Sequence, residues 1–300
     1  MASTQPLTML VLSPVIPGIG VIARFSFLVF RNSELQVSSY GDGVSRKVCV
    51  LSGKLFWSSI QNWNIPAEEA FIFNVLVQNG TLVAVIAYFW KDLWAIVRSF
   101  VQGLLKRQPF AEADSRMGWY LILATIPAGI LGLSIKDLVE EAFASPTATA
   151  VFLLITAGLL LAAERIGKRS RSFESLHWKD AVWMGAAQAL AIFPGISRSG
   201  ATITGGMLQD LDRPSAARFS FLMSIPVMLA AGLVALLDLF NLPNLSGMLL
   251  PVTIGFITAA ITGYLSIRWL LAYLTRKSLG GFAAYCIAAG LTAFVIGWIR

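Results

Sequence analysis

Residues 181–212 read AVWMGAAQALAIFPGISRSGATITGGMLQDLD, and this stretch decides the fold class of the chain. It holds two apolar segments on either side of Pro194-Gly195, and each is too short to cross a bilayer core of about 30 Å, which needs roughly 20 apolar residues. Two half-helices that meet at a polar break and leave on the side they entered form a re-entrant hairpin. We predict such a hairpin over 181–212. The alternative is a pair of short helices at the membrane surface.

The composition of the 300-residue chain is that of a membrane protein. Apolar residues make up 56% of the chain and charged residues only 13%, about half the share of an ordinary soluble domain. So few charges exclude a soluble enzyme, a disordered protein and a disulfide scaffold. The excess of 23 basic over 16 acidic residues indicates cytoplasm-facing loops rather than nucleic-acid binding.

Six segments after residue 70 have the apolar length of a membrane span or come close to it. They are 71–90, 119–135, 149–163, 219–237, 251–274 and 282–299. We therefore expect an all-α, polytopic membrane protein with about six transmembrane helices and at least one re-entrant hairpin.

The charges between these spans orient them. Basic residues gather in three connections, 91–116, 164–179 and 275–281, and are nearly absent from 136–148 and 238–250. The positive-inside rule puts the first three connections in the cytoplasm and the other two outside. Because basic residues also follow the hairpin, an even number of crossings must separate its two ends.

The chain is expected to have five parts. These are an N-terminal region over 1–70, three spans over 71–163, a basic cytoplasmic loop over 164–180, the hairpin over 181–212 and three spans over 213–300. Within the N-terminal region, residues 31–70 show no apolar period of a helix.

Arg198 lies inside the apolar hairpin, where an arginine costs about 2.5–3.5 kcal/mol. An anion should compensate its charge, and a guanidinium binds phosphate through two parallel hydrogen bonds. A half-helix beginning near Gly200 directs the positive end of its dipole to the same place. We predict a phosphate site here. The alternative is a hydroxyl-capped helix start with an arginine that reaches to the membrane surface.

The neighbouring residues suit such a site. Ser197, Ser199 and Thr202 supply short hydroxyl donors, and Gly195 and Gly200 let the backbone approach a ligand.

These residues also carry a resemblance to a known family. Pro194, Gly195, Ser197, Arg198, Ser199 and Thr202 spell the pattern P-G-x-S-R-S-x-x-T. In this pattern the chain resembles the undecaprenyl pyrophosphate phosphatases, the bacitracin-resistance membrane phosphatases. Supporting similarity lies at 73–93, 121–140 and 153–165, and the resemblance covers about residues 70–300. It implies six spans and re-entrant hairpins in two inverted halves.

The resemblance also implies an activity. The chain would be an integral phosphatase of the bacterial inner (plasma) membrane that hydrolyses undecaprenyl diphosphate to undecaprenyl phosphate and inorganic phosphate. This reaction recycles the lipid carrier of cell-wall peptidoglycan synthesis and confers bacitracin resistance. The implied cofactor is Mg²⁺ or Ca²⁺, with its ligands unassigned. The implied partner is an isoprenyl diphosphate lipid, with no nucleic acid and with a homo-oligomer left open.

The resemblance assigns roles to seven residues of this sequence. Ser197, Arg198 and Thr202 are the expected catalytic residues, which hold or attack the phosphate, and Gly195, Ser199, Gly200 and Gln188 are expected to line the phosphate site.

The chain departs from the family in its N-terminal region. The family carries an E-x-x-x-E signature followed by V-S-S-T-G-H, whose carboxylates and histidine suit a general base or a metal site. Here residues 37–42 read VSSYGD, with Asp42 in the place of histidine, and the two acidic positions fall on Val29 and Ser33. The one histidine of the chain, His177, lies in the predicted cytoplasmic loop.

Three hypotheses follow from this departure. The first is an active phosphatase, and the second is a lipid-phosphate binder or flippase that uses the same hairpin without catalysis. The third is a damaged relative whose residues 1–70 are out of frame. We expect the chain to bind isoprenyl diphosphate and to hydrolyse it slowly or not at all.

Overall fold

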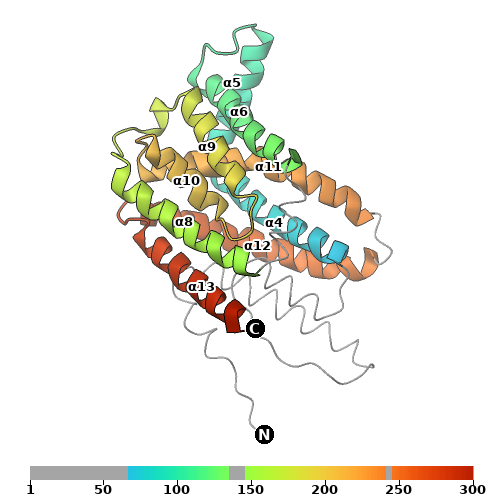
Figure 1. Cartoon of the computed structure of the whole chain (residues 1–300). Helices are drawn as coiled ribbons and strands as arrows, with labels where there is room; N and C mark the ends of the chain where they lie inside the picture. The colour runs from blue at the N-terminus through green and yellow to red at the C-terminus, as the bar shows by residue number, and fades with distance from the viewer. Residues whose placement is uncertain (1–66, 135–145, 241–244, 300) are drawn as a thin grey trace. The chain divides into compact units, whose positions relative to one another are not determined.

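The computed structural model describes residues 67–134, 146–240 and 245–299 (Figure 1). These residues are helical and contain no β-strand, so the all-α prediction is confirmed. The helices are α4 (Ala67–Tyr88), α5 (Trp90–Leu105), α6 (Ala113–Ser134), α8 (Pro146–Ile166), α9 (Trp178–Leu190), α10 (Arg198–Leu208), α11 (Arg213–Phe240), α12 (Leu245–Leu274) and α13 (Gly280–Ile299), with a short 3₁₀ turn at Phe173–Ser175.

Each of the six predicted spans falls on one of the long helices, α4, α6, α8, α11, α12 and α13. By length and apolar composition alone, three described segments could cross a membrane: Thr147–Ile166, Arg213–Leu237 and Leu249–Leu274. Several spanning helices confirm an integral membrane protein, while the number six stays a prediction. The connection expected over 91–116 contains helix α5, which the sequence reading missed.

The described residues form two compact units. The first unit contains 67–87 and 228–269, which are α4, the end of α11 and most of α12. Its glycines allow close packing, since a Cβ added at Gly80 would collide with the carbonyl of Phe256, and one at Gly232 would collide with the side chain of Asn79. Apolar side chains, including Phe73, fill the space between these helices.

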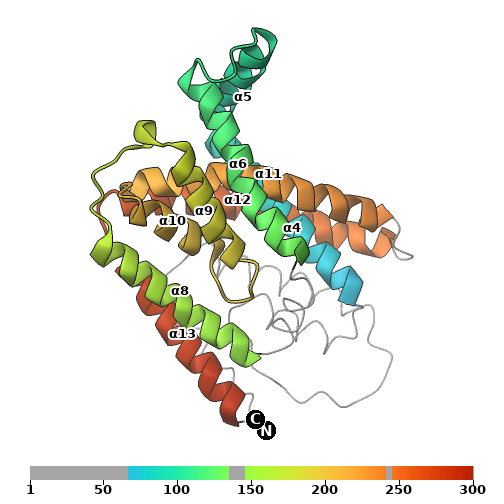
Figure 2. The ribbon, with the colours of Figure 1, turned by 45° about the horizontal axis from the view of Figure 1, so that its top comes forward.

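The second unit contains 88–227 and 270–299 and holds the predicted hairpin. Within it α8 and α13 run side by side (Figure 2), and α9 packs on both α6 and α10. The hairpin is divided as predicted, with α9 and α10 as its two arms and residues 191–197 as the break between them.

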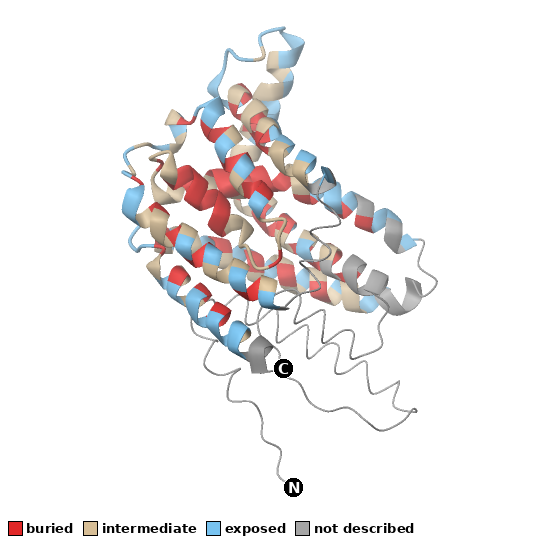
Figure 3. Ribbon diagram, viewed as in Figure 1, coloured by how far each residue is buried: buried red, intermediate tan, exposed pale blue. Residues whose placement is uncertain are grey.

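Helix α10 is the most enclosed element of this unit. Residues 200–207 are all buried, and Figure 3 shows this helix as a continuous red ribbon. A Cβ at Gly205 would lie 3.0 Å from the Cβ of Ala187 on α9, and one at Gly206 would lie 2.9 Å from the Cβ of Ala216 on α11. Small residues therefore let neighbouring helices cover α10, as non-spanning backbone inside a membrane requires.

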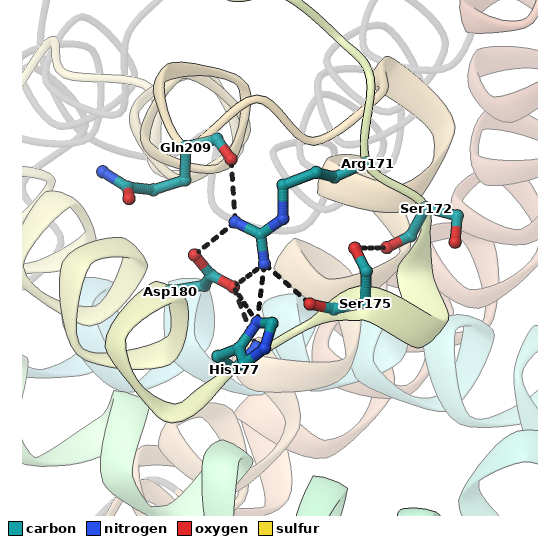
Figure 4. A network of polar contacts seen from close by, with 6 residues as sticks. All are labelled: Arg171, Ser172, Ser175, His177, Asp180 and Gln209. Carbon is teal, nitrogen blue, oxygen red and sulfur yellow. Dashed lines mark hydrogen bonds and ion pairs between the residues drawn. The ribbon is translucent and has the colours of Figure 1, made fainter.

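The two ends of the hairpin are joined by Arg171 (Figure 4). Its guanidinium donates to both carboxylate oxygens of Asp180, in the first turn of α9, at 2.9 and 2.6 Å. It also donates to the carbonyl of Gln209, at the end of α10, at 2.9 Å. The hydrogen bond with Asp180 raises the pKa of Arg171. Because α9 begins where α10 ends, the geometry supports the re-entrant hairpin over two unrelated surface helices.

Further contacts complete this cluster, which we call the hairpin base and define as Arg171, Ser175, His177, Asp180 and Gln209. Arg171 donates to the Ser175 carbonyl at 2.6 Å, and the same guanidinium nitrogen lies 2.8 Å from Nδ1 of His177. The backbone N–H of His177 donates to the carboxylate of Asp180 at 2.8 Å and caps α9. His177 therefore stabilises the loop end of the hairpin, and the cytoplasmic position of that loop stays a prediction.

Candidate functional site

The predicted phosphate site lies at the other end of the hairpin, which we call the hairpin tip, residues 191–200. Gly195 has φ +99°, a conformation that side chains disfavour. A Cβ added there would also collide with the carbonyl of Thr149 on α8. The positive φ of the turn and the close packing of the loop against the Thr149 carbonyl therefore both require glycine at position 195. The tip brings together five predicted site residues, Gly195, Ser197, Arg198, Ser199 and Gly200.

Ser197 caps helix α10. Its Oγ accepts a hydrogen bond from the backbone N–H of Gly200 at 3.1 Å and lies 3.5 Å from the Oγ of Ser199. The cap uses one acceptor lone pair, so the hydroxyl proton of Ser197 can still be donated to a ligand. Arg198 is half-buried and is the first residue of α10. The hydroxyl-capped helix start and the phosphate site are thus compatible features of the same residues.

Thr202 faces the protein interior. It is 1% exposed, its hydroxyl lies 2.9 Å from the carbonyl of Arg198, and its Oγ1 lies 2.5 Å from the Oγ of Ser220 on α11. One hydroxyl proton cannot serve both partners fully, so when Thr202 donates to Arg198, Ser220 donates to Thr202. This arrangement holds α10 against α11. The phosphate contact expected of Thr202 stays a prediction.

Gln188 lies near the end of α9 with 3% of its surface exposed. Neither its amide oxygen nor its amide nitrogen has a hydrogen-bond partner among the described residues, and the same is true of the Thr204 hydroxyl. Leaving a buried polar group unsatisfied costs about 1–3 kcal/mol, so such groups are rare in a core that serves only packing. This unsatisfied amide suits the ligand-binding role expected of Gln188.

The sequence reading missed Thr156, on α8. This residue is fully buried, and its Oγ1 accepts a hydrogen bond from the backbone N–H of Ser197 at 3.2 Å. The same hydroxyl lies 3.3 Å from the Gly195 carbonyl. A single threonine in an apolar helix is ordinary, and no signal in the sequence could have linked it to a loop 41 residues away.

The described residues do not form a metal site of their own. No group of three or more His, Cys, Asp or Glu side chains able to hold a metal ion occurs among them. Residues 188–208 contain no acidic residue and no histidine, whereas Mg²⁺ and Ca²⁺ require oxygen ligands such as carboxylates. Residues 1–66, where the family's acidic motif is expected, lie outside the described part of the chain. The tip as described therefore offers hydrogen-bond donors to an anion and no carboxylate to a cation.

Comparison with known proteins identifies the family. The profile of the family described as "Bacitracin resistance protein BacA" matches residues 36–292. The undecaprenyl-diphosphatase of Corynebacterium efficiens is 39% identical over 250 residues, which cover 82% of this chain and 81% of that protein. Undecaprenyl-diphosphatase 1 of Corynebacterium jeikeium is 42% identical over 247 residues (81% and 84%), and the undecaprenyl-diphosphatase of Thermomicrobium roseum is 40% identical over 236 (76% and 85%).

The extent of the match bears on the N-terminal region. The similarity starts at residue 36, well before the limit of about 70 expected from the sequence, so the second half of residues 1–70 also resembles the family. The hypothesis that the whole of this region is foreign to the family is therefore too broad. Since one family profile covers most of the sequence, the chain belongs to the bacitracin resistance protein (BacA) family.

Proposed function

We propose that this protein hydrolyses undecaprenyl diphosphate to undecaprenyl phosphate and inorganic phosphate at the hairpin tip. Membership of the BacA family and the names of the curated relatives support the reaction. The observation that carries the site is the position of the α10 N-terminus, where Ser197 and Arg198 begin a helix that is buried from Gly200 to Met207. The N-terminus of a helix offers N–H groups and a positive dipole to a phosphate.

The chemistry asks mainly for positioning and charge neutralisation. Water attacks the terminal phosphorus, the bridging P–O bond breaks, and the lipid monophosphate leaves. In this proposal the Arg198 guanidinium neutralises charge on the transferred phosphoryl group, and the hydroxyls of Ser197 and Ser199 donate to its oxygens. Partial burial of Ser197, Arg198 and Ser199 lowers the dielectric around them relative to bulk water, which strengthens these interactions.

Three finer points belong to the same proposal. The substrate is the C55 isoprenyl diphosphate, the protein resides in the bacterial plasma membrane, and Mg²⁺ or Ca²⁺ supports the diphosphate. Resemblance to the family supports all three. A bound cation would supply charge neutralisation, but the described residues do not provide its ligands, so no step above depends on it.

A lipid-phosphate binder or flippase is the second candidate, favoured by the missing E-x-x-x-E and V-S-S-T-G-H patterns. One assay separates the two functions. Phosphate release from C55 and C15 diphosphates in detergent, with Mg²⁺ or with EDTA, is measured beside equilibrium binding of the same lipids. Binding with release supports the phosphatase, and binding without release supports the binder. Absence of binding contradicts both.

A further inference from the structure

Thr156 connects α8 to both sides of Ile196 in the hairpin tip. The Ser197 N–H donates to Oγ1 of Thr156 at 3.2 Å, and the Gly195 carbonyl lies 3.3 Å from the same oxygen. The Phe152 carbonyl, one turn earlier on α8, lies 3.1 Å away. A hydroxyl offers one proton and two lone pairs. The proton is shared between the two carbonyls, and a lone pair receives the Ser197 N–H.

Only part of this arrangement is common in helices. A threonine that donates to the carbonyl four residues earlier is ordinary. Accepting a hydrogen bond from a backbone N–H 41 residues away is not explained by helix formation. It satisfies a polar group of a non-helical loop that is partly buried, and backbone groups removed from water need such partners.

The position of Ser197 follows from this contact. The backbone N–H of Ser197 is held by Thr156, while its Oγ accepts from Gly200 and starts α10. Gly200 also lies close to Thr156, since a Cβ added to Gly200 would be 3.3 Å from Cγ2 of Thr156. Thr156 thus bonds to the tip through its hydroxyl, and its methyl group faces the space that a side chain at Gly200 would occupy.

A second contact holds the loop without polar groups. The rings of Phe152 and Phe193 stack with their centroids 5.0 Å apart. This stacking keeps the loop near α8 but cannot fix the direction of the Ser197 N–H, because it has no directional bond to the backbone there. The hydroxyl of Thr156 is therefore the α8 side-chain group that bonds to the backbone on both sides of Ile196, beside the loop's own Ile196 N–H to Phe193 carbonyl hydrogen bond.

We infer that Thr156 is a positioning residue for the phosphate site, which its hydroxyl keeps in the geometry that binds the transferred phosphate. The inference rests on the proposed function, because the site is the one assigned there. Thr156 does not contact the reacting atoms; it acts through Ser197 and Gly195. Small displacements of positioned groups cost large factors in rate, so loss of the hydroxyl should lower catalysis without abolishing insertion.

The matched comparison is Thr156→Ala against Thr156→Ser, since both lack the methyl group and only serine keeps the hydroxyl. With farnesyl diphosphate as the probe, we expect alanine to lower kcat/KM about 10- to 100-fold and serine to stay within about threefold of the parent protein. The control is Thr262→Val, because within the described part of the chain the Thr262 hydroxyl donates to the carbonyl of Thr258, at 2.7 Å, and has no contact with the tip. This control should leave kcat/KM unchanged.

A second measurement does not depend on turnover. Amide hydrogen exchange of the substrate-free protein should show Ser197 exchanging about tenfold faster in Thr156→Ala than in Thr156→Ser. Equal exchange and equal kcat/KM in the two variants would overturn the inference. If the parent protein releases no phosphate, the proposed function fails, and the exchange comparison together with farnesyl diphosphate affinity still decides the role of Thr156.

Discussion

The base and the tip of the hairpin use polar groups in opposite ways. At the base, Arg171 contacts Asp180, Gln209, Ser175 and His177, so both terminal nitrogens of its guanidinium have partners within the protein. Near the end of α9, three residues before the tip, the buried amide of Gln188 has no partner among the described residues. A fully satisfied network stabilises a structure, whereas unsatisfied buried groups are expected where a ligand completes the bonding. The base thus holds the hairpin together, while the unsatisfied amide at the other end of α9 is what a ligand site predicts.

The largest expected effect is at Arg198. Arg198→Ala should lower phosphate release by about 10³-fold or more, as loss of an arginine that neutralises a transferred phosphoryl group does. Arg198→Lys should lose most of the activity too, since lysine cannot form the bidentate contact. Phosphate release and farnesyl diphosphate binding measure both effects. The control is Arg276→Ala, because Arg276 lies in an exposed connection. Near-normal binding of farnesyl diphosphate by Arg198→Ala would contradict the prediction and would show that Arg198 only reaches to the membrane surface.

The second effect concerns general acid–base catalysis, for which the tip has no carboxylate or histidine. Replacing residues 1–66 with a hairpin that carries E-x-x-x-E and V-S-S-T-G-H should raise turnover by about 10²–10⁴-fold, the usual gain from general acid–base assistance. The measurement is phosphate release in detergent with Mg²⁺. The same graft with both glutamates changed to glutamine is the control. Full activity of the ungrafted chain would contradict the prediction and would mean that an acid such as Glu34, Asp42 or Glu68 acts as the general base.

The third effect separates stability from catalysis. Arg171→Met should lower the free energy of unfolding by roughly 2–4 kcal/mol, because it leaves the Asp180 carboxylate, only 3% exposed, without its cation. Thermal unfolding in detergent measures the loss, and Arg171→Met combined with Asp180→Leu should recover part of it. Activity per folded molecule should change little. A loss as large as that of Arg198→Ala would break the division between base and tip.

The smallest perturbation tests the topology itself. Single cysteines at Ser170 and Pro214, on either side of the hairpin, should react with an impermeant maleimide from the same, cytoplasmic face of the membrane. A cysteine at Leu245 should react from the other face. Labelling of Ser170→Cys and Pro214→Cys from opposite faces would rule out the re-entrant hairpin.

The sequence predicted the hairpin because its determinants are local. Apolar length against bilayer thickness, and the Pro194-Gly195 break, locate α9 and α10 close to the predicted limits of 181–212. The basic residues before and after the hairpin predicted that its two ends lie on one side of the membrane. The contacts of Arg171 with Asp180 and Gln209 agree with this prediction, because they join the two ends.

What the sequence left out depends on packing between distant residues. Thr202 contacts Ser220 because α11 packs against α10. Thr156 contacts Ser197 because α8 also packs against the start of α10. Neither contact has a spacing that a sequence pattern could reveal. Helix α5 was missed for a related reason, since its charged residues suggested a loop while Phe100 packs on Trp119 of α6.

The hairpin base also has a consequence for biosynthesis. Arg171 and Gln209 are 38 residues apart, and the other residues that bond to Arg171 lie between them or within three residues of Gln209. A nascent chain that has reached Asp212 already holds all of these partners, before α11 to α13 are made. Contacts close in sequence form early. The hairpin can therefore close while synthesis of the later helices continues.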